Sequence, residues 1–247
     1  MKAMLGMYDR PETAPAHDRF WTRIHDALGY GPPQLTRDVD FWTLWTSPDL
    51  ILGQTCGLVY KTHLHGQVHL VGTPDYGLTD CPAGHVFGVY LARRDAVSTS
   101  LSDLSTGTFA YSAPWSQTGW ASPALHFAEL GLAPTTRLQT GGHYLSARAV
   151  AEQQADFTAV DFMTWELIRR YDDFAQDLQV IGRMPAVPSG PFITADPSAV
   201  PALQTALDAA VRDMSSEDQA ILGLKGIARL PVSAYLQLPI PPVPTQL

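Results

Sequence analysis

The sequence predicts an α/β protein with two lobes joined by two crossing strands. Apolar, strand-like runs are repeatedly followed by a polar turn and then by an amphipathic helix. Two extended segments, near residues 85–93 and 177–192, carry the chain into and out of a central region. The length of 247 residues is sufficient for two such lobes. We expect a cleft between the lobes, with the crossing strands acting as a hinge.

The composition is that of a folded protein and disfavours several classes of partner. Hydrophobic residues make up 45% of the chain and charged residues 16%, which excludes wholesale disorder. No apolar run approaches the roughly 18 residues of a transmembrane helix, so membrane insertion is not expected. The net charge of −8, with only 16 Lys plus Arg, argues against nucleic acid. A small anion is still compatible with this charge, because local backbone N–H groups can outweigh a distant net charge.

The first lobe is predicted to begin with two strand–helix units. Residues 1–7 form an apolar run typical of a buried strand, and residues 11–28 place apolar side chains at helical spacing up to Gly29. The strand at residues 50–52 is followed by the turn at residues 53–57 and by a helix from Leu58. The polar residues of this turn lie at the carboxyl end of a strand, where open α/β sheets bind ligands.

The remaining elements predict that one lobe is inserted into the other. Residues 67–73 and 85–93 read as strands, and residues 198–214 and 216–222 read as closing helices. The region between them contains two further strand–helix units of its own. We therefore assign residues 1–92 and 182–247 to lobe 1 and residues 93–181 to lobe 2.

The stretch FAYSAPWSQTGW, residues 109–120, places polar residues between an apolar strand and a helix start. Consecutive N–H groups at Ser116, Gln117, Thr118 and Gly119 would point at the entrance of the helix, where the dipole favours negative charge. The two hydroxyls add donors, and Gly119 lets the backbone come close to a ligand. This arrangement predicts an anion-binding turn. The alternative is that Ser116 or Thr118 only caps the helix, a common role of both residue types.

A second polar group is predicted in GGHYLSARAVAEQQADFTAVD, residues 141–161. His143 stands at the start of a helix, from which it could donate to an anion, and Asp161 ends a strand-like run. A carboxylate that faces an anionic ligand tolerates only a ligand with a proton to give. The alternative for each residue is a helix cap, and viewed singly the two interpretations have equal weight.

In their order and spacing, these two stretches resemble the phosphate/phosphite/phosphonate-binding family of ABC-transporter substrate-binding proteins. That family has an apolar strand followed by Pro-x-Ser-x-Ser/Thr-Gly, then Gly-x-His-x-x-Ser-x-x-Ala-Val and Ala-Val-Asp. The resemblance extends from about Leu50 onward and includes the crossing MPAVPSGPFI, residues 184–193. It implies a type II periplasmic-binding-protein fold, a small oxyanion such as phosphate or an organophosphonate as ligand, and an ABC permease as partner. It also implies a periplasmic location, although the chain as written carries no export signal.

The resemblance also implies which residues bind the ligand. In lobe 2 these are Ser116, Gln117, Thr118, His143 and Asp161. In lobe 1 the positions at the strand ends that face the cleft are Tyr8, Gln54 and Thr55. No cofactor and no metal is implied, and the histidines near residue 65 lack a recognised zinc spacing.

This sequence departs from the family pattern in two respects. Gln117 replaces a small hydroxyl residue, and Trp115, Trp120 and Trp165 are expected to crowd the site. If Trp115 and Trp165 line the cleft, they could close over an organic group attached to the anion. The alternative is that these tryptophans belong to the core, as most buried tryptophans do.

Two further classes of protein remain open at this stage. The same architecture hosts cytosolic enzymes such as lyases, in which Cys56, His143 or Asp161 would act on the ligand, and it also hosts ligand sensors. No nucleophile elbow, Walker loop or dinucleotide-binding fingerprint occurs in the chain. Cys56 and Cys81 could form a disulfide, but two thiols are the commoner state in a chain of this size.

Overall fold

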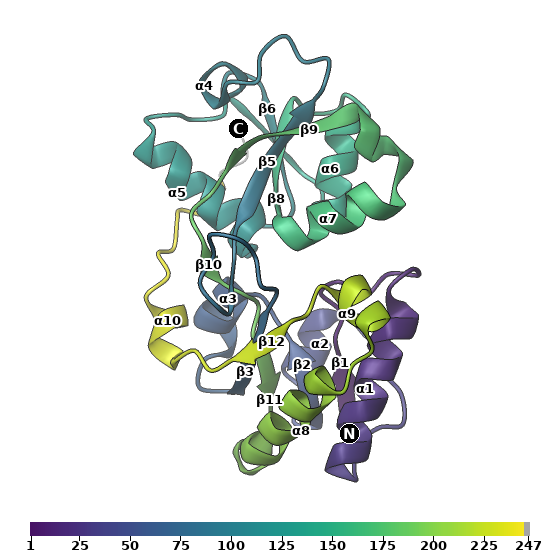
Figure 1. Ribbon diagram of the computed structural model, residues 1–247. Coiled ribbons are helices and arrows are strands. Elements are labelled where there is room, and N and C mark those ends of the chain that lie inside the picture. The colour runs from purple at the N-terminus through teal and green to yellow at the C-terminus, as the bar shows by residue number, and fades with distance from the viewer. Residues whose placement is uncertain (245–247) are drawn as a thin grey trace. The chain divides into compact units, whose positions relative to one another are not determined.

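The computed structural model describes residues 1–244 and divides into two compact units, which are treated separately (Figure 1). Unit 1 consists of Met1–His85 and Pro188–Leu238. Unit 2 consists of Val86–Val187 together with residues 239–244. The chain passes from one unit to the other at two short strands, β4 (His85–Val86) and β10 (Val187–Pro188), which pair with each other.

The boundaries lie at residues 85/86 and 187/188, whereas we expected them at 92/93 and 181/182. The reason is that β5 (Gly88–Arg93) pairs on one side with β8 (Phe157–Asp161) and on the other with β9 (Leu178–Arg183). These strands form one side of the sheet of unit 2. The segment from Pro239, which we expected in lobe 1, also belongs to unit 2. Its Pro242 carbonyl accepts a hydrogen bond from the indole N–H of Trp120 at 3.2 Å.

Unit 1 is built on a mixed five-stranded sheet. The strand order is β1-β2-β11-β3-β12. β1 and β2 are parallel, whereas β11 runs antiparallel to both β2 and β3. The strands are β1 (Lys2–Met4), β2 (Leu50–Gln54), β3 (His69–Asp75), β11 (Phe192–Thr194) and β12 (Gly226–Ala228).

The helices of unit 1 bury their apolar faces in the same unit. The first helix shows how the local sequence sets its bounds: a proline lies in its first turn, and Gly29 at its end adopts a left-handed φ of 74°. The N–H of Gly29 then donates to the carbonyl of His25. The helices are α1 (Ala14–Leu28), α2 (Phe41–Trp45), α3 (Gly57–Val59), the π-helix η1 (Tyr60–Leu64), the 3-10 turn η4 (Pro197–Ala199), α8 (Val200–Arg212), α9 (Ser216–Leu222) and α10 (Val232–Leu236).

Unit 2 contains a second five-stranded sheet, with the order β7-β6-β8-β5-β9. β6 (Thr108–Tyr111) is parallel to both β7 (Thr136–Gln139) and β8, whereas β5 is antiparallel to β8. In the view of Figure 1, α5 lies on one side of β5 and β8, and α6 and α7 lie on the other. The helical elements are α4 (Leu101–Leu104), the π-helix η2 (Gln117–Ala121), α5 (Ser122–Glu129), α6 (His143–Ala151), α7 (Phe162–Tyr171) and the 3-10 turn η3 (Asp173–Asp177).

Aromatic side chains make up much of the core of unit 2. Phe109 and Phe157, from the neighbouring strands β6 and β8, are fully buried and pack with ring centroids 5.1 Å apart. Phe127 of α5 covers both rings at 5.4 and 5.9 Å. This packing holds α5 against the two strands that precede the candidate site.

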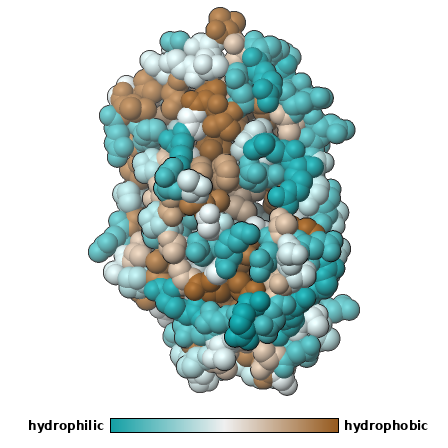
Figure 2. Space-filling view, viewed as in Figure 1, coloured by the Kyte–Doolittle hydropathy of each residue, from teal (hydrophilic) through white to brown (hydrophobic). Residues whose placement is uncertain are grey.

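The surface mixes polar and apolar residues, as Figure 2 shows for one face. Such a mixture is ordinary for folded proteins. None of the helices formed by residues 1–244 combines the length and the apolar character needed to cross a bilayer.

Candidate anion-binding site

The carboxyl ends of three parallel strands of unit 2 meet at one edge of its sheet. β7, β6 and β8 are neighbours in that order, and each is followed by a helical element that starts at this edge. These elements are η2 with α5 after β6, α6 after β7, and α7 after β8. The N-terminus of a helix carries unsatisfied N–H groups and the positive end of the helix dipole. This edge of the sheet therefore favours an anion.

The turn from Ser116 to Gly119 lies at this edge and is almost entirely buried. Ser116, Gln117 and Thr118 are 9%, 5% and 7% exposed. Ser116 caps η2, because its Oγ accepts the N–H of Gly119 at 3.1 Å. The capping alternative is thus realised for Ser116, and η2 is a π-helix, a wide turn that is often found at functional sites.

Position 119 requires a glycine, because two hydroxyl oxygens lie where a side chain would begin. A Cβ at this position would lie 2.1 Å from Oγ of Ser112 and 2.8 Å from Oγ of Ser116. Real side chains do not tolerate such distances, so a larger residue would displace one or both serines. The hydroxyls of Ser112 and Ser116 therefore lie against the same face of Gly119.

The protonation of His143 follows from its two hydrogen bonds. The backbone N–H of Asp161 donates to Nδ1 of the ring at 3.3 Å, and a backbone N–H can only donate. Nδ1 is therefore unprotonated, and the proton of the neutral ring is on Nε2, which lies 3.1 Å from Oγ of Ser116. Burial lowers the pKa of the His143 imidazole below its usual value, while the charge of Asp161 acts in the opposite direction. The ring is neutral at pH 7.

This arrangement leaves the hydroxyl proton of Ser116 available to a ligand. A serine oxygen has two lone pairs and one proton. One lone pair accepts the N–H of Gly119 and the other accepts Nε2–H of His143. The hydroxyl proton must then point to a third partner, and an oxyanion at the helix start would be a suitable acceptor.

Asp161 caps α7 with both of its carboxylate oxygens. Oδ1 accepts the backbone N–H of Thr164 at 2.9 Å, and Oδ2 accepts the hydroxyl of Thr164 at 2.5 Å. The residue is 6% exposed, and Oδ2 lies 3.8 Å from Nδ1 of His143. The capping alternative is thus realised for Asp161 as well. Its backbone N–H, and not its carboxylate, is hydrogen-bonded to the histidine ring.

Sequence reasoning missed Ser112, which follows directly after β6. The residue is 3% exposed, and its Oγ has no hydrogen-bond partner among the described residues. Its backbone carbonyl accepts the N–H of Gly141 at 2.8 Å, which ties the end of β6 to the loop before α6. The available signal was a hydroxyl residue at the carboxyl end of a strand that leads into the predicted anion-binding turn.

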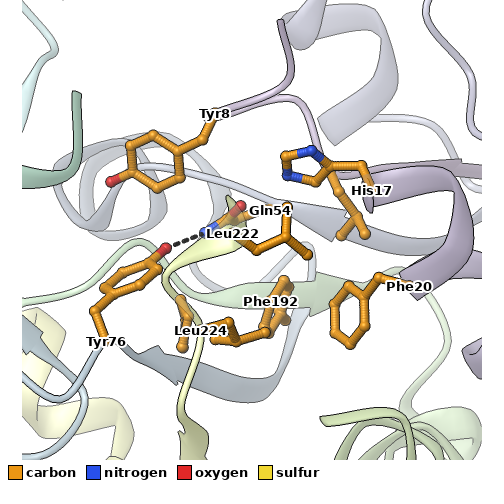
Figure 3. A pocket seen from close by; sticks show the side chains of 10 residues that line it. Tyr8, His17, Phe20, Gln54, Tyr76, Phe192, Leu222 and Leu224 are labelled. Atoms are coloured by element: carbon orange, nitrogen blue, oxygen red, sulfur yellow. Dashed lines mark hydrogen bonds between the residues drawn. The ribbon is translucent and has the colours of Figure 1, made fainter. Parts of the chain in front are cut away.

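In unit 1, the predicted residues Tyr8 and Gln54 lie around Tyr76 and line one pocket (Figure 3). The Gln54 amide nitrogen donates to the hydroxyl of Tyr76 at 3.5 Å and to the carbonyl of Gly190 at 3.3 Å. The rings of Tyr8 and Tyr76 meet edge to face, with centroids 5.8 Å apart. The pocket, of about 20 Å³, is otherwise mainly apolar; its lining is Leu5, Tyr8, His17, Phe20, Gln54, Pro74, Tyr76, Phe192, Leu222 and Leu224.

Thr55 is not part of this lining, although it follows Gln54 directly. Thr55 is completely buried, and its backbone N–H donates to the carbonyl of Pro191 at 3.0 Å. Its hydroxyl has no hydrogen-bond partner within residues 1–244. The structure thus brings together Tyr8 and Gln54 but places the side chain of Thr55 elsewhere in unit 1.

Two of the three tryptophans that we expected at the site are core residues. Trp120 is 6% exposed and packs on Tyr111 with a centroid distance of 5.0 Å, and Trp165 is 4% exposed within α7. Trp115 is 41% exposed in the loop before Ser116. Among these three tryptophans, Trp115 therefore has the most exposed side chain.

Within residues 1–244, no group of three or more His, Cys, Asp or Glu side chains is arranged to hold a metal ion. Cys56 and Cys81 are thiols and not a disulfide.

Known structures with the same architecture identify the fold as that of the two-lobed periplasmic binding proteins. PhnD1 from Prochlorococcus marinus, in complex with methylphosphonate, matches with a TM-score of 0.74 over 93% of this chain and 91% of its own, at 12% identity. XAC2383 from Xanthomonas citri, bound to ATP, matches with a TM-score of 0.65 over 92% and 93%, at 18% identity. PA3383, a binding protein component of an ABC phosphonate transporter from Pseudomonas aeruginosa, matches with a TM-score of 0.67 over 92% and 79%, at 17% identity. The predicted fold class is confirmed.

The family follows from the sequence itself. Residues 65–232 match the family described as "ABC transporter, phosphonate, periplasmic substrate-binding protein". The chain belongs to this family, and the predicted resemblance is confirmed. The match includes the predicted residues of unit 2 and begins after Tyr8, Gln54 and Thr55. No match was found among curated proteins.

Proposed function

We propose that the site in unit 2 binds the head group of a phosphonate or of phosphate and that the protein delivers this ligand to an ABC permease. The observation that carries the proposal is the hydroxyl of Ser116, whose two lone pairs are occupied by Gly119 and His143. This hydroxyl acts as a donor, and it lies at a helix start where negative charge is favoured. Methylphosphonate in PhnD1 and ATP in XAC2383 show that proteins of this fold accept phosphorus oxyanions.

The donors of the proposed site come from one turn. The backbone N–H groups of Gln117 and Thr118 occupy the first positions of η2, where a helix provides no internal acceptor. With the hydroxyls of Ser116 and Thr118, they supply up to four donors to a tetrahedral head group. His143 acts through Ser116, because its Nε2 proton is directed at the serine oxygen and not at the ligand. In this proposal His143 is a positioning residue.

Asp161 and the polar residues of unit 1 are proposed as further ligand contacts. Each carboxylate oxygen of Asp161 already accepts one hydrogen bond and has a second lone pair for a ligand with a proton to give. Tyr8 and Gln54 present a phenol and an amide at one pocket of unit 1. For Thr55, the buried hydroxyl without a partner supports the proposal.

Binding without turnover is favoured by the tautomer of His143. Ser116, His143 and Asp161 are the three residue types of a hydrolytic triad. In such a triad the histidine is the general base, and it needs a free lone pair on Nε2 to take the serine proton. Here Nε2 carries the proton, because the N–H of Asp161 occupies Nδ1. We therefore propose no catalytic role for these residues.

The proposal is tested by titration calorimetry of the purified protein with methylphosphonate, phosphate, sulfate and acetate. We expect saturable binding of at least one phosphorus oxyanion and an unchanged ligand by phosphorus NMR after prolonged incubation. Thr118→Val should weaken binding, whereas Thr136→Val, at the exposed amino end of β7, should not. No binding of any phosphorus oxyanion, or consumption of the ligand, contradicts the proposal.

A further inference from the structure

We infer that Ser112 is an additional ligand-binding residue, which donates its hydroxyl to the head group and makes the site select three-oxygen over two-oxygen head groups. This inference rests on the proposed function of the unit 2 site. It adds a residue that lies outside the turn from Ser116 to Gly119.

The hydroxyl of Ser112 is buried and unsatisfied. Ser112 is only 3% exposed, and its Oγ has no hydrogen-bond partner among the described residues. A buried hydroxyl without a partner is unfavourable, so native proteins rarely retain one unless it serves a ligand or an ordered water. The unmet hydrogen bond of Ser112 is therefore a sign of a missing partner.

The hydroxyl of Ser112 also lies close to that of Ser116. The ideal Cβ position of Gly119 lies 2.1 Å from Oγ of Ser112 and 2.8 Å from Oγ of Ser116, so both hydroxyls lie within reach of one small region. Because Gly119 has no side chain, the two hydroxyls can occupy this space together. Ser116 already has a proton to donate there, because both of its lone pairs are used. A second hydroxyl beside it suits an anion with more than one oxygen.

The backbone of Ser112 is held in place by two hydrogen bonds between neighbouring segments. The Ser112 carbonyl accepts the N–H of Gly141 at 2.8 Å, and the neighbouring Tyr111 carbonyl accepts the N–H of Thr140 at 2.9 Å. The end of β6 is thereby joined to the loop that leads into α6. A donor on a fixed backbone loses little conformational freedom when it binds a ligand.

The consequence is a preference among head groups. A phosphonate presents three oxygens on a tetrahedral phosphorus, whereas a phosphinate or a carboxylate presents two. In this inference, the donors of the turn at Ser116–Gly119 are shared by two of the oxygens, and the Ser112 hydroxyl serves the third. Loss of this hydroxyl should therefore weaken the binding of methylphosphonate more than that of dimethylphosphinate.

The test compares Ser112→Ala with Ser105→Ala in titrations with methylphosphonate and dimethylphosphinate. Ser105 is a suitable control because it is buried in the same unit, while its hydroxyl donates to the carbonyl of Ser102. For Ser112→Ala we expect a roughly tenfold weaker affinity for methylphosphonate, at most a twofold change for dimethylphosphinate, and a melting temperature that is unchanged or higher. Ser105→Ala should leave both affinities unchanged. Ser112→Gly, which also removes the hydroxyl, serves if the alanine variant does not fold.

The outcomes separate this inference from the proposed function. If the wild type binds methylphosphonate and the Ser112 variants bind it equally well, Ser112 is not a ligand contact, while the proposed function stands. If the Ser112 variants lose affinity equally for both probes, the residue binds ligand but the inferred selectivity is wrong. If the wild type binds no phosphorus oxyanion, both the proposed function and the inference are overturned.

Discussion

The backbone N–H of Asp161 donates to Nδ1 of His143 at 3.3 Å and thereby sets the tautomer of the ring. Nε2 of the same ring then carries a proton and donates to Ser116 at 3.1 Å. These two hydrogen bonds link Asp161 at the end of β8, His143 at the start of α6 and Ser116, the cap of η2. The link turns the hydroxyl of Ser116 into a donor, which is the property that an anion-binding site needs.

The first prediction concerns His143. His143→Phe removes the donor to Ser116, so the hydroxyl no longer has one fixed direction, and the affinity for methylphosphonate should fall by about five- to tenfold. His143→Gln keeps an amide N–H of similar reach and should restore part of the affinity. Calorimetric titration of the two variants measures the difference. Equal affinities of the phenylalanine variant and the wild type would show that the ring does not act through Ser116.

The second prediction concerns Gly119. Gly119→Ala places a methyl group 2.1 Å from the Ser112 hydroxyl oxygen, which forces the turn to move. We expect a loss of about 1–3 kcal/mol in the free energy of unfolding and a loss of anion binding. Gly182→Ala is the matched control, because its Cβ would meet no atom closer than 3.5 Å. Urea unfolding and titration measure both effects, and normal anion binding by the Gly119 variant would contradict the proposed site.

The third prediction concerns the cap of α7. Asp161→Ala removes both bonds to Thr164, and this should cost about 0.5–2 kcal/mol of unfolding free energy. Asp161→Asn keeps one acceptor for the N–H of Thr164 and should retain most of the stability. If Asp161 also accepts a proton from the ligand, the asparagine variant should still bind more weakly than the wild type. An asparagine variant with wild-type stability and affinity would leave Asp161 as a cap only.

The fourth prediction concerns pH. Burial lowers the pKa of His17 and of His143 in the folded protein, although Asp9 beside His17 and Asp161 beside His143 oppose the shift. The unfolded chain, with histidine pKa values near 6.5, then binds more protons than the folded protein once the pH falls below that value. Stability should therefore be highest above about pH 6.5 and should decrease on acidification toward the lower folded pKa values.

Urea unfolding between pH 7.5 and about 5.5 measures this dependence. His17→Gln should flatten it, whereas the exposed His63, replaced in the same way, provides the control. Carboxylates contribute little in this range because their ordinary pKa values are lower. A stability that increases on acidification from pH 6.5 to 5.5 would contradict the predicted direction.

Much of the fold could be predicted from the sequence, because apolar strand-like runs, polar turns and amphipathic helices recur along the chain. The helix that ends at Leu28 and the strand that ends at Asp161 appear where the pattern places them. β7 (Thr136–Gln139) could not be predicted, since none of its residues is buried and it has no apolar alternation. The boundaries of unit 2 depend on strand pairing between distant segments, which local patterns do not contain.

The residue types of the candidate site can be read from the sequence, whereas the contacts between them cannot. Ser116 and Asp161 have the sequence neighbourhood of helix caps, and both are caps. The contact between His143 and the N–H of Asp161 joins residues that lie 18 positions apart, so it requires the tertiary structure. The same is true of Ser112, whose unsatisfied hydroxyl can be recognised only once its neighbours are known.

The central claim is that an oxyanion binds at the start of η2 in unit 2. A backbone amide NMR titration of the isotope-labelled protein with methylphosphonate tests it most directly. We expect saturable shifts of the Gln117, Thr118 and Gly119 amides, with one dissociation constant that agrees with calorimetry, and no such shifts in Ser116→Ala at the same ligand concentration. Binding by calorimetry with unmoved amides at these three positions would contradict the claim, because the ligand would then occupy another site.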